Sequence, residues 1–162
     1  MTPLEMPDKI AAIPSGGMDE DTEFAWFIST EPIVANYPEV SSLRSYAFYS
    51  SPMLTVASFP ACTAIGSYAF AYCSNLTTAS FPACITIGGY AFYNCRLLLG
   101  LYLTGPQYIT LSASNAFNST PIAGYTTSTG GVYGSIYVPA SMLETYKTRT
   151  NWSFFSSRFA EV

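Results

Sequence analysis

The segment FPACTAIGSYAFAYCSNLTTAS, residues 59–80, is followed directly by the related segment FPACITIGGYAFYNCRLLLGLY, residues 81–102. A third version, YPEVSSLRSYAFYSSPMLTVAS, precedes them from residue 37. The three align without gaps at a period of 22, so that the triplet Tyr-Ala-Phe recurs in register from Tyr46, Tyr68 and Tyr90. A fourth, degenerate copy reaches Phe117 after about three inserted residues. Self-similarity at such a period is the signature of a repeat architecture.

The repeat predicts a solenoid, mainly β with short helical or turn segments, because each unit buries its apolar side chains only by stacking on its neighbour. Stacking in register would align Phe48, Phe70 and Phe92 in an aromatic column. The cysteines recur every 11 residues, and buried free thiols are favoured over disulfides that would strain the stack. The side chains expected to face inward in one unit are Leu76, Ala79, Phe81, Ile87, Ala91, Phe92 and Cys95.

The flanks are expected to cover the open ends of the solenoid, where core and unpaired strand edges would otherwise be exposed. Residues 1–36 are predicted as an N-terminal arm and cap with a short helix over 22–29, and residues 37–123 as a solenoid of about four units. Residues 124–162 are predicted as a C-terminal cap with a hairpin or loop, a strand over 135–138 and a helix over 140–149. An apolar lid would follow, formed by Trp152, Phe154, Phe155 and Phe159.

Charge is scarce and lies almost entirely in the flanks. The chain has ten Asp or Glu, six Lys or Arg and no histidine, and between Ser45 and Leu143 Arg96 is the sole Asp, Glu, Lys or Arg. A histidine-dependent nucleophile, a carboxylate pair or an oxygen-ligand metal site therefore has no residues to use in the body of the chain. A basic stripe for nucleic acid is missing too, and no apolar run approaches the roughly 20 residues of a membrane span. We expect no enzyme activity, no cofactor or metal, no nucleic-acid binding and no membrane insertion.

The repeat unit resembles a known family. IGSYAFAYCSNLTTASFP from Ile65 and IGGYAFYNCRLLLGLYLT from Ile87 resemble the BspA-type leucine-rich repeat, over about residues 37–117. Ser51 replaces the expected Cys in the first unit and Thr104 the expected Pro in the third, which suggests capping or transitional units. The resemblance implies a capped solenoid of the kind found in bacterial surface adhesins and in tail-associated proteins of phages. The closing segment GSIYVPASMLETYKTRTNWSFFSSRF also resembles the end of many such repeat proteins.

A candidate recognition surface follows from the exposed positions of the repeat. Tyr46, Tyr68 and Tyr90 would form a ladder, either for stacking on sugars or for stacking the repeats with only the hydroxyl groups in water. Outward strand positions, among them Thr78, Ser80 and Tyr102, predict a flat, uncharged face that either binds a partner or solubilises the body. Arg96 is either an anchor for a carboxylated sugar or an exposed or backbone-bonding residue.

Two functions are consistent with these features. The first is a virion component of a phage, on its tail or surface, that presents an uncharged repeat face for host-surface binding or assembly. The alternative is a secreted bacterial surface adhesin at the cell surface. The opening residues MTPLEMPDKIAAIPSGG lack the basic start and apolar stretch of a secretory signal, which favours the virion. The expected partners are other virion or surface subunits, a bacterial surface glycan or protein, and further copies of this chain.

Overall fold

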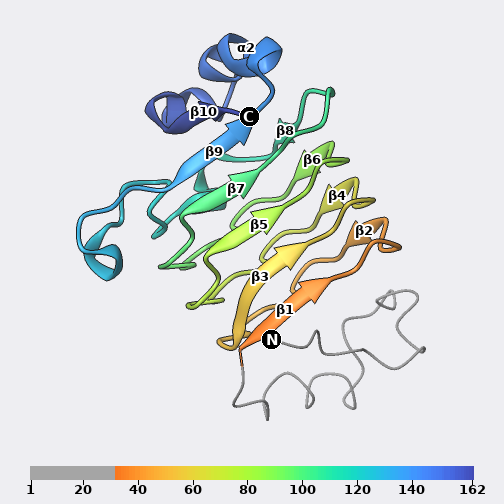
Figure 1. Ribbon diagram of the computed structural model, residues 1–162, viewed down its shortest axis with the longest axis vertical. Helices are drawn as coiled ribbons and strands as arrows, with labels where there is room; N and C mark the ends of the chain where they lie inside the picture. The colour runs from red at the N-terminus through yellow and green to blue at the C-terminus, as the bar shows by residue number, and fades with distance from the viewer. Residues whose placement is uncertain (1–31) are drawn as a thin grey trace.

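The computed structural model describes residues 32–162, and these wind into parallel strands that stack coil on coil (Figure 1). The six-stranded sheet A has the order β1 (Ile33–Asn36), β3 (Leu54–Ser58), β5 (Thr78–Ser80), β7 (Gly100–Tyr102), β9 (Ser135–Val138) and β10 (Phe159–Glu161). The four-stranded sheet B has the order β2 (Ser42–Leu43), β4 (Ala64–Ile65), β6 (Thr86–Ile87) and β8 (Thr110–Leu111). Every neighbouring pair is parallel, and the pairs within the regular repeats follow the period of 22, for example Ala57 with Ala79 and Leu43 with Ile65. The predicted repeat solenoid is confirmed.

Turns close each coil on a third side, which we call the turn side (residues 44–51, 66–73 and 88–95). There the backbone N–H of Tyr46 donates to Ser67 O at 3.1 Å, and that of Phe48 donates to Ala69 O at 2.6 Å. The same pattern continues in the next coil, where Phe70 N–H donates to Ala91 O at 2.8 Å. The turn side is therefore hydrogen-bonded from coil to coil like a sheet, although its residues form turns.

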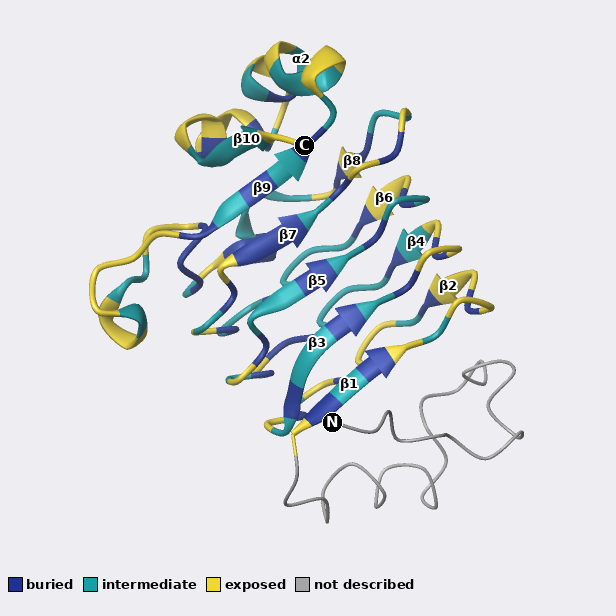
Figure 2. Cartoon of the chain, in the orientation of Figure 1, coloured by how far each residue is buried: buried dark blue, intermediate teal, exposed yellow. Residues whose placement is uncertain are grey.

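The core consists of aromatic columns along the solenoid axis. The rings of Phe48, Phe70 and Phe92 stack with centroids 5.2 Å apart at each step, and Phe117 continues the column at 5.6 Å. Phe59 and Phe81 form a second column that meets the first edge-on. Figure 2 shows the buried positions running along sheet A, and all the residues predicted to face inward are fully buried. The aromatic column expected from the sequence is confirmed.

The cysteines are buried and free, as predicted. The thiols of Cys73 and Cys95 donate to the carbonyl oxygens of Phe48 and Phe70, each at 3.0 Å. Burial raises the pKa of Cys84 to about 12 and that of Cys95 well above its usual range. The thiols of Cys84 and Cys95 therefore remain protonated, and the buried cysteines serve as small apolar groups with one weak donor.

Sheet A begins before residue 37. Ala35 and Asn36 of β1 pair with Ala57 and Ser58 of β3, so that the stacked region extends further toward the N-terminus than the gap-free alignment indicated. The predicted helix over 22–29 lies outside the described residues. At the other end, Leu101 of β7 pairs with Ile136 of β9, so that the last coil carries a long loop. That loop contains the 3₁₀ turns η1 (Ser114–Phe117) and η2 (Thr127–Thr129).

The insertion in the fourth copy is accommodated at Gly105 and Gln107. Ile87 pairs with Leu111 rather than with residue 109, which shows that part of the insertion precedes β8. Gly105 packs so closely against Pro82 O that no side chain fits there. The side-chain amide of Gln107 donates to Pro82 O at 2.9 Å and to Cys84 O at 3.1 Å. The inserted segment therefore stays hydrogen-bonded to the coil before it.

The C-terminal segment packs against the last coil. The strand predicted over 135–138 is β9, whereas the helix predicted over 140–149 is divided into η3 (Ala140–Met142) and α2 (Leu143–Thr148). After η4 (Ser153–Arg158) the chain returns to sheet A as β10, beside β9. Trp152 and Phe155 are buried against Phe117, with ring centroids 6.0 Å and 5.2 Å away.

One residue of the expected apolar lid is placed differently. Phe154 is 74% exposed, whereas its neighbour Phe155 is 5% exposed. Successive side chains of a 3₁₀ turn point about a third of a turn apart, so two adjacent phenylalanines cannot both face the core. The prediction that Phe154 belongs to the lid was therefore wrong.

The same segment supplies hydrogen bonds to β8, the last strand of sheet B, and to Ile109 directly before it. Trp152 Nε1 donates to Ile109 O at 2.8 Å, and the Ile109 N–H donates to the hydroxyl of Tyr146 at 3.1 Å. Asn151 donates its side-chain amide to Leu111 O at 2.8 Å. These side chains take the place of a further strand, since they satisfy backbone groups that a sheet edge would otherwise leave unpaired.

Candidate recognition surfaces

Tyrosines that are exposed or half-buried gather on the turn side in two rows, which together we call the tyrosine face. In the first row Tyr46 and Tyr68 stack at 5.1 Å with an angle of 2° between the rings, and Tyr68 and Tyr90 at 5.0 Å and 15°. The second row meets edge to face, at 5.4 Å and then 5.3 Å between ring centroids. The members of the tyrosine face are Tyr46, Tyr49, Tyr68, Tyr72, Tyr90 and Tyr93.

The first row has an unusual backbone. Tyr46, Tyr68 and Tyr90 have φ values of 66°, 58° and 55°, in the left-handed region that bulky residues rarely adopt. That conformation costs about 1–2 kcal/mol per residue, and here the hydrogen bonds between turns hold it in place. The row ends at Tyr90, because the next coil has Asn115 at the equivalent position, and its side-chain oxygen accepts the Tyr90 N–H at 3.3 Å. Three strained tyrosines thus lie in line on the surface.

The stacking decides which part of each ring a ligand can reach. Parallel rings in the first row lie face to face, so a sugar cannot stack on the faces between them. Ring edges and hydroxyl groups remain accessible, and Tyr46 is 54% exposed. Partial desolvation and the neighbouring tyrosines raise the pKa of Tyr68 and Tyr72, so these hydroxyls remain neutral donors and acceptors. Stacking of these tyrosines from coil to coil, one of the two alternatives stated from the sequence, occurs in this row.

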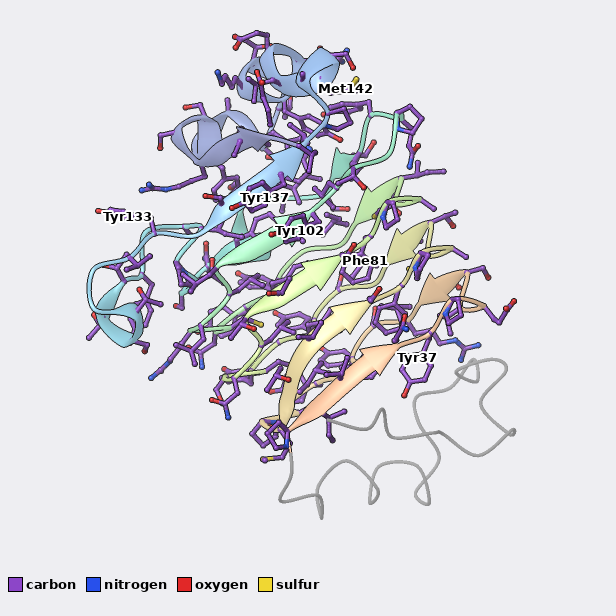
Figure 3. The ribbon with its side chains drawn as sticks, in the orientation of Figure 1. Tyr37, Phe81, Tyr102, Tyr133, Tyr137 and Met142 are labelled. Carbon is purple, nitrogen blue, oxygen red and sulfur yellow. The ribbon has the colours of Figure 1, made fainter. Side chains whose placement is uncertain are left out.

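The outward face of sheet A is a separate surface. Thr78 is in register with Gly100, and Ser80 with Tyr102. The Tyr102 ring leans over Gly100 and stacks on Tyr137 at 4.5 Å, and Figure 3 shows the two rings side by side. From β1 to β9 the outward positions are uncharged, as expected: Val34, Val56, Thr78, Gly100 and Ser135 in one line, and Asn36, Ser58, Ser80, Tyr102 and Tyr137 in the other.

Arg96 lies in the segment that joins the turn side to β7. Its Nε donates to the side-chain oxygen of Asn94 at 2.8 Å, and its guanidinium lies 5.5 Å from the ring centroid of Tyr125. The predicted surface residues therefore occupy different places: Tyr46, Tyr68 and Tyr90 on the turn side, Thr78, Ser80 and Tyr102 on sheet A, and Arg96 between them. They do not form one site.

An open hollow of about 290 Å³ lies beside η4, and nothing in the sequence indicated it. Its lining comes from two segments that lie far apart in the chain and outside the regular repeats: Ser114, Asn118, Ile122 and Ala123 from the last coil, and Phe154, Phe155, Ser157 and Arg158 from η4. No repeat pattern connects these segments, so the period of 22 held no signal for this hollow.

Stacked parallel strands, a core of Phe, Leu and Cys, and a sheet A whose outward positions are uncharged from β1 to β9 define a leucine-rich repeat solenoid. Among residues 32–162 no cluster of potential metal ligands occurs, and no helix there has the length and hydrophobicity needed to cross a membrane. The family model of the BspA type leucine rich repeat region matches residues 20–128 in six copies, and the chain belongs to this family. None of the curated proteins matches it.

The family match agrees with the resemblance inferred from the repeat motif and extends it on both sides. About four units were expected over 37–123, whereas the matched region starts at residue 20 and ends at residue 128. Proteins with such repeats generally act as non-enzymatic scaffolds for protein interactions, and BspA-type members are often found at the cell surface or outside the cell. The chain is accordingly a structural or recognition protein in the broad sense.

Proposed function

We propose that this protein binds a neutral polymer on a bacterial surface, most directly a glycan, through its tyrosine face. The observation that carries the proposal is the alignment of exposed and half-buried tyrosines on consecutive turns, four of them (Tyr46, Tyr68, Tyr72 and Tyr90) with a left-handed backbone conformation. Phenol hydroxyl groups both donate and accept hydrogen bonds, which suits a ligand rich in hydroxyl groups. Their regular spacing along the solenoid axis suits a ligand that is itself a repeating chain.

Binding of this kind depends little on charge. The members of the tyrosine face are uncharged, and each hydroxyl contributes a modest hydrogen bond of about 0.5–1.5 kcal/mol. Useful affinity would come from several contacts along the row and from several copies of the protein on one particle or surface. Adsorption to cells should therefore change little between low and high ionic strength.

The place of display that we propose is a phage virion, on the tail or particle surface, where the chain would contact other virion subunits or further copies of itself. Support comes from the resemblance of the repeat, which tail-associated proteins of phages share with bacterial surface adhesins, and of the closing segment, which ends many such repeat proteins in phages and gut bacteria. Mass spectrometry and immunogold labelling of purified particles test this location. Detection of the protein only in the cell envelope of a bacterium would favour the alternative, a secreted surface adhesin.

The recognition role is tested with purified protein and intact host cells. The triple variant Tyr46→Phe, Tyr68→Phe, Tyr90→Phe keeps the stacked rings and removes the hydroxyl groups, so it should fold normally. It should adsorb at least tenfold more weakly, which corresponds to a loss of about 1.4 kcal/mol of binding free energy. The matched control is Tyr102→Phe with Tyr137→Phe, a stacked pair on sheet A, which should adsorb like the unmodified protein. Unchanged adsorption of the triple variant would overturn the role of the tyrosine face.

A further inference from the structure

The hollow beside η4 has a chemically mixed lining. Its apolar base is formed by Ile122 and Phe155, which are 1% and 5% exposed. Polar side chains surround this base, namely those of Ser114, Asn118 and Ser157. The volume of about 290 Å³ lies at the lower end of small-ligand sites, which leaves room for one ring but not for a chain of them.

Arg158 brings a positive charge to the edge of this hollow. Its guanidinium lies 3.7 Å from the ring centroid of Tyr133, and this cation–π contact holds the group beside the ring. In Figure 3 the labelled Tyr133 lies beside the η4 turn. Within the part of the chain that the structure describes, Lys147 and Glu144 form the one ion pair, so no described carboxylate neutralises Arg158. A cation–π contact uses the face of a guanidinium, so its N–H groups remain free for a carboxylate that lies in the guanidinium plane.

The remaining lining offers hydrogen bonds and an aromatic surface. Over residues 32–162, the side chains of Ser114, Asn118 and Ser157 have no hydrogen-bond partner. Phe154 is 74% exposed at the same hollow, although its neighbour Phe155 is buried. An exposed phenylalanine in a charge-poor protein gives an apolar surface on which a flat ligand can lie. The hollow thus combines a fixed cation, free hydroxyl and amide groups, and an exposed ring.

We infer that this hollow binds an acidic sugar residue, a pyranose ring that carries a carboxylate. The carboxylate pairs with the guanidinium of Arg158, the ring hydroxyl groups bond to Asn118, Ser114 and Ser157, and the apolar face of the sugar lies on Phe154. A simple anion would use only the cation and leave the other groups unpaired. A nucleic acid would need several cations, whereas the hollow has one.

This site goes beyond the proposed role of the tyrosine face and is independent of it. The tyrosine face is neutral and lies on the turns of the repeats, whereas the hollow is cationic and lies between the last coil and η4. Binding at the hollow weakens with salt, and binding at the tyrosine face does not. One site can therefore fail a test while the other passes.

The test is a titration of the ¹⁵N-labelled protein with sodium glucuronate, and separately with glucose, which has the same ring without the carboxylate. Glucuronate should shift the backbone amide signals of Asn118, Ser157 and Arg158 and leave that of Tyr68 in place. Glucose should bind at least tenfold more weakly, because a hydrogen bond to a charged group contributes about 1.5–3 kcal/mol, which is roughly 10- to 150-fold in affinity. Equal shifts with both sugars, or no shifts with glucuronate, would overturn the inference.

Variants locate the binding groups. Arg158→Gln removes the charge and should weaken glucuronate binding about tenfold or more while leaving glucose binding unchanged. Phe154→Ala should weaken the binding of both sugars, because the exposed ring contacts the sugar face that they share. Tyr68→Phe, on the tyrosine face, is the matched control and should bind glucuronate normally. Amide spectra of each variant confirm that it folds, and an Arg158→Gln variant that folds and binds glucuronate with full affinity would refute the role of the guanidinium.

Discussion

Replacement of Trp152 by alanine tests whether the C-terminal segment holds the last coil in place. The indole is fully buried, packs on Phe117 and Tyr146 with ring centroids 6.0 Å and 5.2 Å away, and donates Nε1–H to Ile109 O at 2.8 Å. Trp152→Ala removes all of these contacts at once. It also leaves the Ile109 carbonyl without a partner at the edge of sheet B.

The expected loss of stability has two sources, the lost packing of the indole ring and the lost hydrogen bond to Ile109 O. Truncation of a large buried aromatic side chain to alanine costs about 3–5 kcal/mol. A buried carbonyl left without its donor adds about 1–3 kcal/mol unless water reaches it. Since a domain is stable by only about 5–15 kcal/mol, the variant loses a large fraction of its stability. Trp152→Phe separates the two contributions, because it keeps most of the ring packing and loses the hydrogen bond to Ile109.

The measurement combines urea unfolding with hydrogen exchange. In a repeat solenoid each coil is stabilised mainly by its neighbours, so the damage should be greatest in β8, β9 and β10 and smaller in β3 and β5. Phe154→Ala, two positions away but 74% exposed, is the control and should change the free energy of unfolding by less than about 0.5 kcal/mol. If Trp152→Ala costs less than about 1 kcal/mol, or if exchange rises equally in all coils, the reasoning about the last coil is refuted.

Further predictions concern the core and the insertion. Burial raises the pKa of Cys84 and of Tyr146 to about 12 each. With rising pH the unfolded chain loses these two protons before the folded chain does, so the free energy of unfolding should fall between about pH 9 and 12. The measurement is the urea midpoint at each pH. A midpoint that is constant over that range would contradict the burial of these groups. Because Cys73 and Cys95 are fully buried, a thiol reagent should label neither in the folded protein at neutral pH and both after unfolding; rapid labelling of the native state would speak against the stacked core. Gly105→Ala should cost about 1–3 kcal/mol, since its new methyl group meets the backbone oxygen of Pro82, whereas Gly89→Ala, which meets only the end of the Asn115 side chain at 3.3 Å, should be nearly neutral in the same urea assay.

The core was predictable because its contacts repeat with the sequence. Phe48, Phe70 and Phe92 stack on one another because a parallel stack places equivalent residues side by side. The period of 22 therefore predicts that residues 22 positions apart are in contact. The buried thiols follow from the same register. The tyrosine ladder was predictable to the same extent, since its members are one period apart. Its left-handed backbone was not, because the triplet Tyr-Ala-Phe contains no glycine or asparagine to signal a positive φ.

The surface beyond the repeats was not predictable in this way. Trp152 reaches Ile109 across 43 residues and Asn151 reaches Leu111 of β8 across 40, and no period connects these positions. The side on which Phe154 emerges depends on the register of a short 3₁₀ turn, and the hollow depends on how that turn packs against the last coil. Arg158 was counted with the charged flank, and its stacking on Tyr133 gives it a particular place and orientation.

The sequence by itself therefore determined the repeat, its period, the inward-facing residues and the scarcity of charge in the body of the protein. The sequence determines these properties because each coil packs against a coil of nearly the same sequence. The pattern within one repeat therefore predicts the contacts between coils. The tertiary structure alone decided how the chain closes over β8, which faces of the tyrosine rings remain free, and that a cation, polar groups and an exposed phenylalanine meet at one hollow. Those arrangements join segments with no shared pattern, so only the packing of the folded chain brings them together.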